Sequence, residues 1–170
     1  MDLKQYIRDI PDFPEPGILF RDITPLLRDP GAFQAVIDRL VDHYHDNAFD
    51  TLVAVESRGF LFGAPMAYRM SKSLVPVRKK GKLPAATHTA EYSLEYGSSI
   101  MEIHAGDIAS GSRVLILDDL LATGGTLDAT ARLVEVSGGA VAGIGLVIEL
   151  MDLEGRSRLS NYDVFSLIQF

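Results

Sequence analysis

The fold of this chain is decided by Val114-Leu115-Ile116-Leu117-Asp118-Asp119-Leu120-Leu121-Ala122-Thr123-Gly124-Gly125-Thr126. Four apolar residues lead into two carboxylates, and a small Gly-rich turn follows and ends in a hydroxyl residue. The pattern predicts a buried strand over residues 114–118 and a helix over residues 126–136 that ends at Gly138-Gly139. The turn between them should therefore lie at the carboxyl edge of a sheet.

Strands and helices alternate along most of the remaining chain. Apolar runs predict strands over residues 51–55, 74–77, 141–150 and 164–168. Helical spacing predicts helices over residues 33–44, with Pro30 near the start, and 61–70. This alternation is typical of an α/β fold with a central, mainly parallel sheet flanked by helices, and we expect one domain over residues 1–170. Ligands of such sheets bind beyond the carboxyl ends of the strands.

Two segments depart from this alternation. At the N-terminus we expect a short helix over residues 3–9. Residues 10–17 should be irregular because three prolines fix the backbone and remove hydrogen-bond donors. Residues 85–104 hold Thr, Tyr and Ser in loose alternation around Gly97, which predicts a hairpin-like flap.

Composition excludes several classes of protein. The chain has 170 residues and a formal charge of −7, which disfavours a nucleic-acid partner. It has no cysteine, so disulfides, thiol catalysis and thiolate metal sites are excluded. No apolar run approaches the roughly 20 residues of a membrane span, and the first residues lack the order of a signal peptide. We expect a cytoplasmic protein without a membrane partner.

The acid doublet and the glycine turn suggest a site for a sugar phosphate. Glycine and alanine let backbone N–H groups approach an anion, and the following helix N-terminus favours negative charge. The turn matches neither a P-loop nor a dinucleotide fingerprint. A plain turn with Thr126 as the helix N-cap remains open. Asp118 and Asp119 suit a ribose diol, or a hydrated Mg²⁺ near one, although an exposed acidic turn is the alternative.

Two further segments carry positive charge. Arg58 follows the strand over residues 51–55 and has a planar fork that matches paired phosphate oxygens, although a surface turn is also possible. A dense basic patch precedes the flap and suits either a polyanion or a solvated loop; it comprises Arg78, Lys79, Lys80 and Lys82. None of the four histidines shows metal-ligand spacing with the others.

Residues 115–126 closely resemble the phosphoribosyl-pyrophosphate (PRPP) signature of type I phosphoribosyltransferases, and in this form its adenine-specific branch. Residues 13–27, 56–63, 78–84 and 92–97 match the same family in its order and spacing, so the resemblance covers nearly the whole chain. It implies transfer of the 5-phosphoribosyl group of PRPP to adenine, which gives AMP and pyrophosphate. It also implies a homodimer and Mg²⁺ that is bound with PRPP through substrate and water, with no direct protein ligand.

The resemblance also implies a role for each block. The 5′-phosphate would bind to Ala122, Thr123, Gly124, Gly125 and Thr126, and the ribose hydroxyls to Asp118 and Asp119. Pyrophosphate would meet Glu56, Ser57, Arg58, Gly59, Lys79, Lys82 and Tyr96, with a cis peptide at Glu56–Ser57 and the lysines reaching across the dimer. Glu95 would be the acid/base residue beside the purine. Adenine would lie among Leu19, Phe20, Arg21, Leu120 and Leu150, which by sequence alone could equally be core residues.

Two other functions remain open at this point. The same chemistry could act on another purine base, such as hypoxanthine, guanine or xanthine, although the block over residues 20–25 argues against it. A nucleotide-sensing regulator could keep the fold and lose catalysis. The flap and the basic patch look intact, and this argues for an enzyme.

Overall fold

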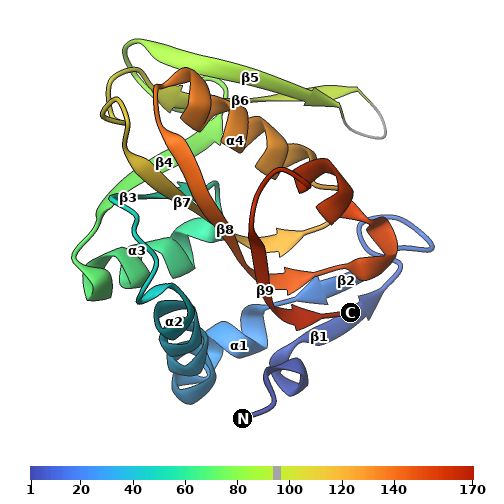
Figure 1. Cartoon of the computed structure of the whole chain (residues 1–170). Helices are drawn as coiled ribbons and strands as arrows, with labels where there is room; N and C mark the ends of the chain where they lie inside the picture. The colour runs from blue at the N-terminus through green and yellow to red at the C-terminus, as the bar shows by residue number, and fades with distance from the viewer. Residues whose placement is uncertain (94–96) are drawn as a thin grey trace.

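The structure is a computed structural model and describes residues 1–93 and 97–170. Figure 1 shows a large twisted sheet with helices on both faces and a small two-stranded sheet beside the C-terminus. The large sheet has seven strands in the order β5-β6-β4-β3-β7-β8-β9. Its strands are β3 (Thr51–Val55), β4 (Ser73–Lys79), β5 (Thr87–Ser93), β6 (Ser98–His104), β7 (Arg113–Leu121), β8 (Ala140–Glu149) and β9 (Val164–Gln169).

Five neighbouring strands of the large sheet are parallel. β3 pairs with β4 and β7, and β8 pairs with β7 and β9, all in parallel register. β6 joins β4 and β5 in antiparallel register. The expected α/β fold with a mainly parallel sheet is confirmed, and the flap over residues 85–104 is the antiparallel hairpin β5–β6.

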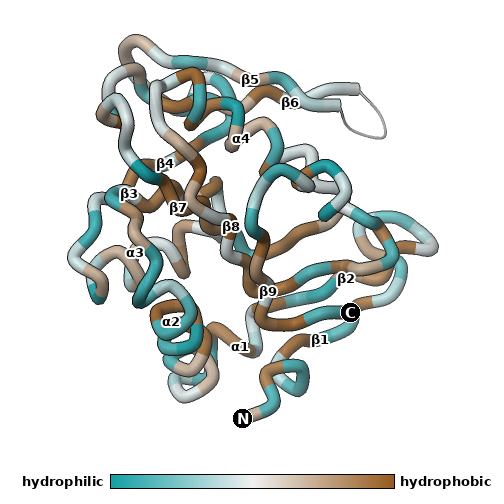
Figure 2. Tube along the Cα trace, in the orientation of Figure 1, coloured by the Kyte–Doolittle hydropathy of each residue, from teal (hydrophilic) through white to brown (hydrophobic). Residues whose placement is uncertain are grey.

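The helices divide between the two faces of the sheet. They are α1 (Thr24–Arg28), α2 (Pro30–Tyr44), α3 (Gly59–Met70) and α4 (Gly125–Val136), with 3₁₀ turns η1 (Leu3–Tyr6), η2 (Met151–Leu153) and η3 (Gly155–Leu159). Along β3, Leu52 and Ala54 join the core under α1, α2 and α3, whereas Val53 and Val55 join the core under α4. Alternate residues of a strand point to opposite faces, so a fully apolar strand is needed at this position. Figure 2 shows the resulting apolar colour of the central strands.

The N-terminal expectation is partly wrong. The helix over residues 3–9 ends at Tyr6, and β1 (Arg8–Pro11) then pairs with β2 (Leu19–Asp22) in an antiparallel two-stranded sheet. Residues 10 and 11, expected to be irregular, are the last two of β1, because Pro11 at the strand end loses no central hydrogen bond. The irregular part is the loop between the strands, with a cis bond at Phe13–Pro14.

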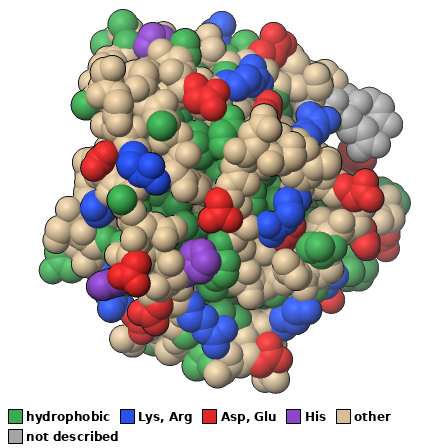
Figure 3. Space-filling view, viewed as in Figure 1, with side chains coloured by type: hydrophobic (Ala, Val, Ile, Leu, Met, Phe, Trp, Pro, Cys, Tyr) green, Lys and Arg blue, Asp and Glu red, His purple; other side chains and the backbone are tan. Residues whose placement is uncertain are grey.

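The remaining elements agree with the pattern apart from their ends. β7 continues to Leu121, beyond the expected end at Asp118, so both acids lie within the strand. The short helix α1 was not expected. In the described part of the chain, no helix is long and apolar enough to cross a membrane. On the face drawn in Figure 3, acidic and basic side chains lie interspersed.

Candidate active site

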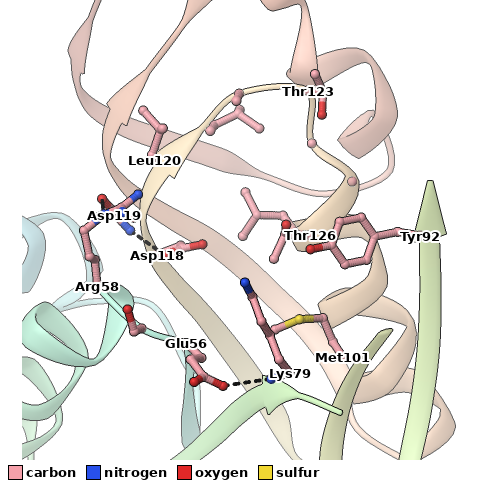
Figure 4. A pocket seen from close by; sticks show the side chains of 16 residues that line it. Glu56, Arg58, Lys79, Tyr92, Met101, Asp118, Asp119, Leu120, Thr123 and Thr126 are labelled. Carbon is pink, nitrogen blue, oxygen red and sulfur yellow. Dashed lines mark hydrogen bonds and ion pairs between the residues drawn. The ribbon is translucent and has the colours of Figure 1, made fainter. Parts of the chain in front are cut away.

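A cavity of about 380 Å³ opens at the carboxyl edge of the parallel strands. Its walls come from the loop after β3, the end of β4, the strands β5 and β6, and the turn between β7 and α4 (Figure 4). Most of the predicted site residues line it: Glu56, Ser57, Arg58, Lys79, Asp118, Asp119, Leu120, Ala122, Thr123, Gly124, Gly125 and Thr126. Four segments that are far apart in the sequence therefore meet in one cavity.

The turn after β7 forms an open seat for an anion. The helix α4 has Gly124 as its N-cap, at φ +83°, and no side chain caps it. The alternative with Thr126 as N-cap is therefore wrong. The first backbone N–H groups of a helix have no acceptor within the helix, and here no side chain replaces one. These groups and the Thr126 hydroxyl line the cavity wall, as an oxyanion site requires.

The acid doublet is buried at the floor of the cavity. Asp118 and Asp119 are 8% and 4% exposed, and the Asp119 N–H donates to Asp118 Oδ1 over 2.8 Å. Burial, together with the charge of Asp119, raises the pKa of Asp118 well above its usual range. Arg58 donates from Nε to Asp119 Oδ2 and is about half exposed. Its guanidinium therefore pairs with the acid doublet and also faces the open cavity.

Glu56 ties the loop after β3 to the end of β4. Its carboxylate accepts the Lys79 N–H at 2.8 Å and Arg78 Nη2 at 3.2 Å. Burial opposes ionisation of Glu56, but these hydrogen bonds outweigh it and lower the pKa. The expected cis peptide at Glu56–Ser57 is present. Gly59 does not line the cavity: a Cβ there would lie 2.9 Å from the Leu117 carbonyl oxygen, so the glycine lets α3 approach β7.

The two predicted lysines lie in different surroundings. Lys79 points from the end of β4 into the cavity, toward Asp118 (Figure 4). Lys82 is exposed and lies outside the cavity lining. Its loop is held by Glu102, a buried residue of β6 that accepts the N–H groups of Lys82 at 3.0 Å and Leu83 at 2.7 Å.

The predicted base-binding residues do not share one wall of this cavity. Only Leu120 lines it, and Leu150 follows the end of β8. Leu19, Phe20 and Arg21 belong to β2 in the small sheet. Phe20 packs edge-to-face against Phe13, with ring centroids 5.1 Å apart. Arg21 pairs with Asp9 and lies 4.0 Å from the ring centroid of Phe170.

Four cavity residues escaped sequence reasoning: Tyr92, Met101, Leu121 and Leu127. Tyr92 of β5 and Met101 of β6 line the cavity from the flap side. Figure 4 shows Tyr92 beside Thr126, and a Cβ at Gly125 would lie 3.0 Å from the Tyr92 ring. The signal was present, since Tyr92 opens the matched block over residues 92–97, but alternation alone gave it no role.

Glu95 and Tyr96 lie outside the described residues, so their predicted positions stay predictions. Among residues 1–93 and 97–170, no group of three or more His, Cys, Asp or Glu side chains is arranged to hold a metal. The carboxylates of Asp118 and Asp119 remain as oxygen donors at the cavity. Mg²⁺ commonly binds through one or two carboxylates plus water and substrate phosphates, and this donor set fits such binding.

Comparison with known proteins identifies relatives along the whole chain. The family model described as "Phosphoribosyl transferase domain" matches residues 23–170. The chain is 56% identical to an adenine phosphoribosyltransferase of Solibacter usitatus, over 99% of this chain and 98% of the relative. The crystal structure of adenine phosphoribosyltransferase from Thermoanaerobacter pseudethanolicus superposes with a TM-score of 0.97 at 53% identity, covering 99% and 98% of the chains. The enzyme of Saccharomyces cerevisiae, solved with adenine and an imino-altritol bisphosphate, gives 0.91 at 43% identity, covering 97% and 96%.

Proposed function

Because this chain belongs to the phosphoribosyl transferase family, among its adenine phosphoribosyltransferases, we propose that its cavity joins adenine to the ribose of PRPP. The products are AMP and pyrophosphate. One observation carries the proposal: a helix N-terminus without a side-chain cap, two buried carboxylates and two cations line the same 380 Å³ cavity. This cavity supplies a seat for each charged part of PRPP, and residues 1–170 act as one domain around it.

In this proposal the turn over residues 122–126 binds the 5′-phosphate. The backbone N–H groups at the start of α4 donate to its oxygens, together with the hydroxyls of Thr123 and Thr126. Asp118 and Asp119 accept hydrogen bonds from the ribose hydroxyls. Because both carboxylates are buried and fixed by hydrogen bonds, the sugar is held without reorganisation of the site.

Pyrophosphate leaves toward the positive side of the cavity. Arg58 and Lys79 both line it there, and the proposed pyrophosphate loop over residues 56–59 contributes Glu56, Ser57 and Arg58 to the lining. Adenine N9 forms a bond to ribose C1 as the bond from C1 to the pyrophosphate oxygen breaks, and the proton on the imidazole ring of adenine passes to the acid/base residue beside the purine, proposed as Glu95. Positive charge develops on the sugar and negative charge on the leaving group. Preorganised cations stabilise the leaving group because they need not reorient during the reaction.

The base-binding end is the least preformed part of the proposed site, because only Leu120 of its residues lines the cavity. Phe20 offers an aromatic face for the purine, and backbone groups of Leu19 and Arg21 read its edge. Leu120 and Leu150 bound the other side. Glu95 acts near the purine, and Tyr96 closes over PRPP; both belong to the flap that excludes water.

Mg²⁺ is proposed to arrive with PRPP, and when bound it neutralises charge on the pyrophosphate. Asp118 and Asp119 would contact it through water or through the substrate. A homodimer belongs to the same proposal, because Lys82 is exposed and lies outside the lining of its own chain's cavity, so that it can reach another chain. A cytoplasmic location remains a prediction from the sequence.

The deciding experiment incubates the protein with PRPP, Mg²⁺ and one base at a time. We expect AMP and pyrophosphate from adenine, measured by chromatography, and little product from hypoxanthine, guanine or xanthine. Turnover of another purine without AMP formation from adenine would contradict the proposal. Binding of AMP without any turnover would instead support a nucleotide-sensing regulator. Light scattering at several concentrations tests the dimer.

A further inference from the structure

The segment η3 packs directly behind the phosphate-binding turn. A Cβ at Gly155 would overlap the carbonyl oxygen of Ala122 and lie 2.8 Å from Leu121 Cδ1. A Cβ at Gly124 would lie 2.6 Å from the Gly155 carbonyl oxygen. The backbones of the turn and of η3 therefore touch, with no side chain between them. Any displacement of Gly155 is passed directly to the phosphate seat.

An ion pair with one buried partner anchors η3 to the sheet, since Glu149 is buried and Arg156 is partly exposed. Arg156 donates from Nε to Glu149 Oε1 over 2.8 Å and from Nη2 to Glu149 Oε2 over 2.5 Å. Its remaining nitrogen, Nη1, donates to the Val164 carbonyl oxygen over 2.6 Å. The Ser166 hydroxyl donates to the same carboxylate over 2.6 Å. The Glu149 side chain is only 3% exposed, so the pair holds Arg156, and Gly155 beside it, in one place.

The same residues connect the phosphate seat to the proposed base end. Glu149 precedes Leu150, whose N–H donates to the Leu121 carbonyl oxygen over 2.9 Å. The Glu149 carbonyl oxygen accepts the N–H of Phe170 over 3.0 Å. The guanidinium carbon of Arg21, a residue of the proposed base segment, lies over the Phe170 ring at 4.0 Å from its centroid. These links to the base end are backbone hydrogen bonds of Glu149 and Leu150. Changes at Gly155 or at the Arg156 side chain leave them in place and should act on the phosphate seat alone.

We propose that Gly155 and the Glu149–Arg156 ion pair are positioning residues, which hold the phosphate seat in the geometry that binds PRPP. The inference rests on the proposed function, because it needs the turn over residues 122–126 to bind the 5′-phosphate. For the buried carboxylate of Glu149, the cost of desolvation offsets part of the attraction to Arg156. The bidentate geometry instead fixes position, which is what a phosphate seat requires.

The first experiment compares Gly155→Ala, Arg156→Lys and a control, Arg113→Lys, with the wild type. Arg113 lies at the opposite end of β7 and donates to the Ala48 carbonyl oxygen. The control therefore makes the same change, arginine to lysine, at a position far along the strand from the phosphate-binding turn. We expect Gly155→Ala to raise KM for PRPP about 10-fold or more, because small displacements of a binding seat are costly. Arg156→Lys keeps the positive charge but loses the bidentate guanidinium geometry, and should raise KM for PRPP by about 3-fold. KM for adenine should change by less than about 2-fold in each, and Arg113→Lys should match the wild type.

A purely structural role would lower the melting temperature without this split between the two KM values. A folded Gly155→Ala protein with KM for PRPP within about 2-fold of wild type overturns the proposal. If Gly155→Ala does not fold, the same criterion is applied to Arg156→Lys.

A second measurement needs no variant. Ribose 5-phosphate should slow amide hydrogen exchange in residues 155–159 as well as in residues 122–126 of the wild-type protein. Protection of residues 122–126 alone overturns the positioning role and leaves the proposed function intact. Absence of ribose 5-phosphate binding to the wild type overturns the proposed function itself, so the two failures are distinguishable.

Discussion

The two ends of the site are built in different ways. The proposed phosphate end lies at the edge of the large sheet, where Gly124 and Gly125 are buried and Asp118 and Asp119 are almost fully covered. The proposed base end includes the small sheet β1–β2, where Leu19 is 45% exposed. Phe20 there packs against Phe13 and not against the large sheet.

This difference follows from what each end must bind. A phosphate and a ribose diol need many fixed donors and acceptors, and only a packed core holds such groups in place. A flat base needs an apolar slot that can open and close. Half-exposed residues on a small sheet have fewer contacts, and regions of this kind open at lower free-energy cost than a core. In the proposed site, the sugar end is therefore the buried and rigid end, and the base end is the exposed and adaptable end.

The largest effect is expected at the rigid end. Asp119→Asn removes the charge that holds Arg58 and faces the ribose, so kcat should fall about 100-fold, as for loss of one preorganised electrostatic group. The melting temperature should change by less than about 4 °C, because asparagine has the same shape. Steady-state kinetics and calorimetry measure the two quantities. Asp128→Asn is the control, since Asp128 pairs with Arg132 outside the cavity lining. Equal kinetics in the two variants would contradict the role of the doublet.

The second prediction separates the two lysines. Lys79→Met should lower kcat/KM for PRPP about 30-fold, because a charged hydrogen bond to phosphate contributes about 1.5–3 kcal/mol. Lys82 lies outside the lining of its own cavity. Lys82→Met should match Lys79→Met only if Lys82 reaches the cavity of another chain. Mixing Lys82→Met with Asp119→Asn protein would then restore part of the activity in hybrid dimers. If Lys82→Met behaves as wild type, its assignment to pyrophosphate is wrong.

The sequence predicted the rigid end well because its signals are local. An apolar run, two acids and a glycine turn each specify backbone geometry within a few residues, and they appear as β7, the buried doublet and the start of α4. The sequence did not reveal Glu102 or Gly155, because their partners lie 19 or more residues away. Such contacts depend on packing between elements, which no periodicity encodes.

The small sheet was missed for a related reason. Residues 8–11 and 19–22 are short and mixed in polarity, and each is a strand only through pairing with the other. The prolines favoured an irregular assignment over residues 10–17, which is correct for the loop and wrong for residues 10 and 11 at the end of β1. Adaptable regions have weak local signals, so the base end was also the harder end to predict.

The third prediction tests the adaptable end. Phe20→Ala should raise KM for adenine about 10-fold, since stacking of a base on an aromatic ring contributes about 1–3 kcal/mol. KM for PRPP should stay within about 2-fold, because Phe20 does not line the phosphate cavity. Phe13→Ala is the matched control, as it removes the edge-to-face partner and leaves the proposed stacking ring in place. A rise in KM for PRPP without a rise in KM for adenine would contradict the assignment of Phe20 to the base-binding end.

The smallest effect concerns stability, and it contrasts two buried carboxylates. The pKa of Asp118 is raised in the folded state, whereas in the unfolded state it is near 3.8. Between these two pKa values the folded protein binds a proton that the unfolded protein has lost. Stability therefore falls as pH rises through this window. Asp118→Asn removes the penalty, and its melting temperature should exceed that of wild type at pH 7 by about 2–4 °C for each kcal/mol regained. The advantage should shrink as pH approaches 4.

Glu149 should behave in the opposite way. Its hydrogen bonds with Arg156, acting against burial, lower the pKa to about 2. The stability that its charge contributes is present above its unfolded pKa, near 4.5, and is lost as pH falls toward 2. Glu149→Gln should therefore be less stable than wild type at pH 7, and the difference should narrow in acid. Calorimetry of both variants from pH 3 to pH 8 gives the two slopes. If the stability difference from wild type changed with pH in the same direction for both variants, one carboxylate would be held differently from the way its contacts indicate. The phosphate end would then be less preorganised than the cavity geometry implies.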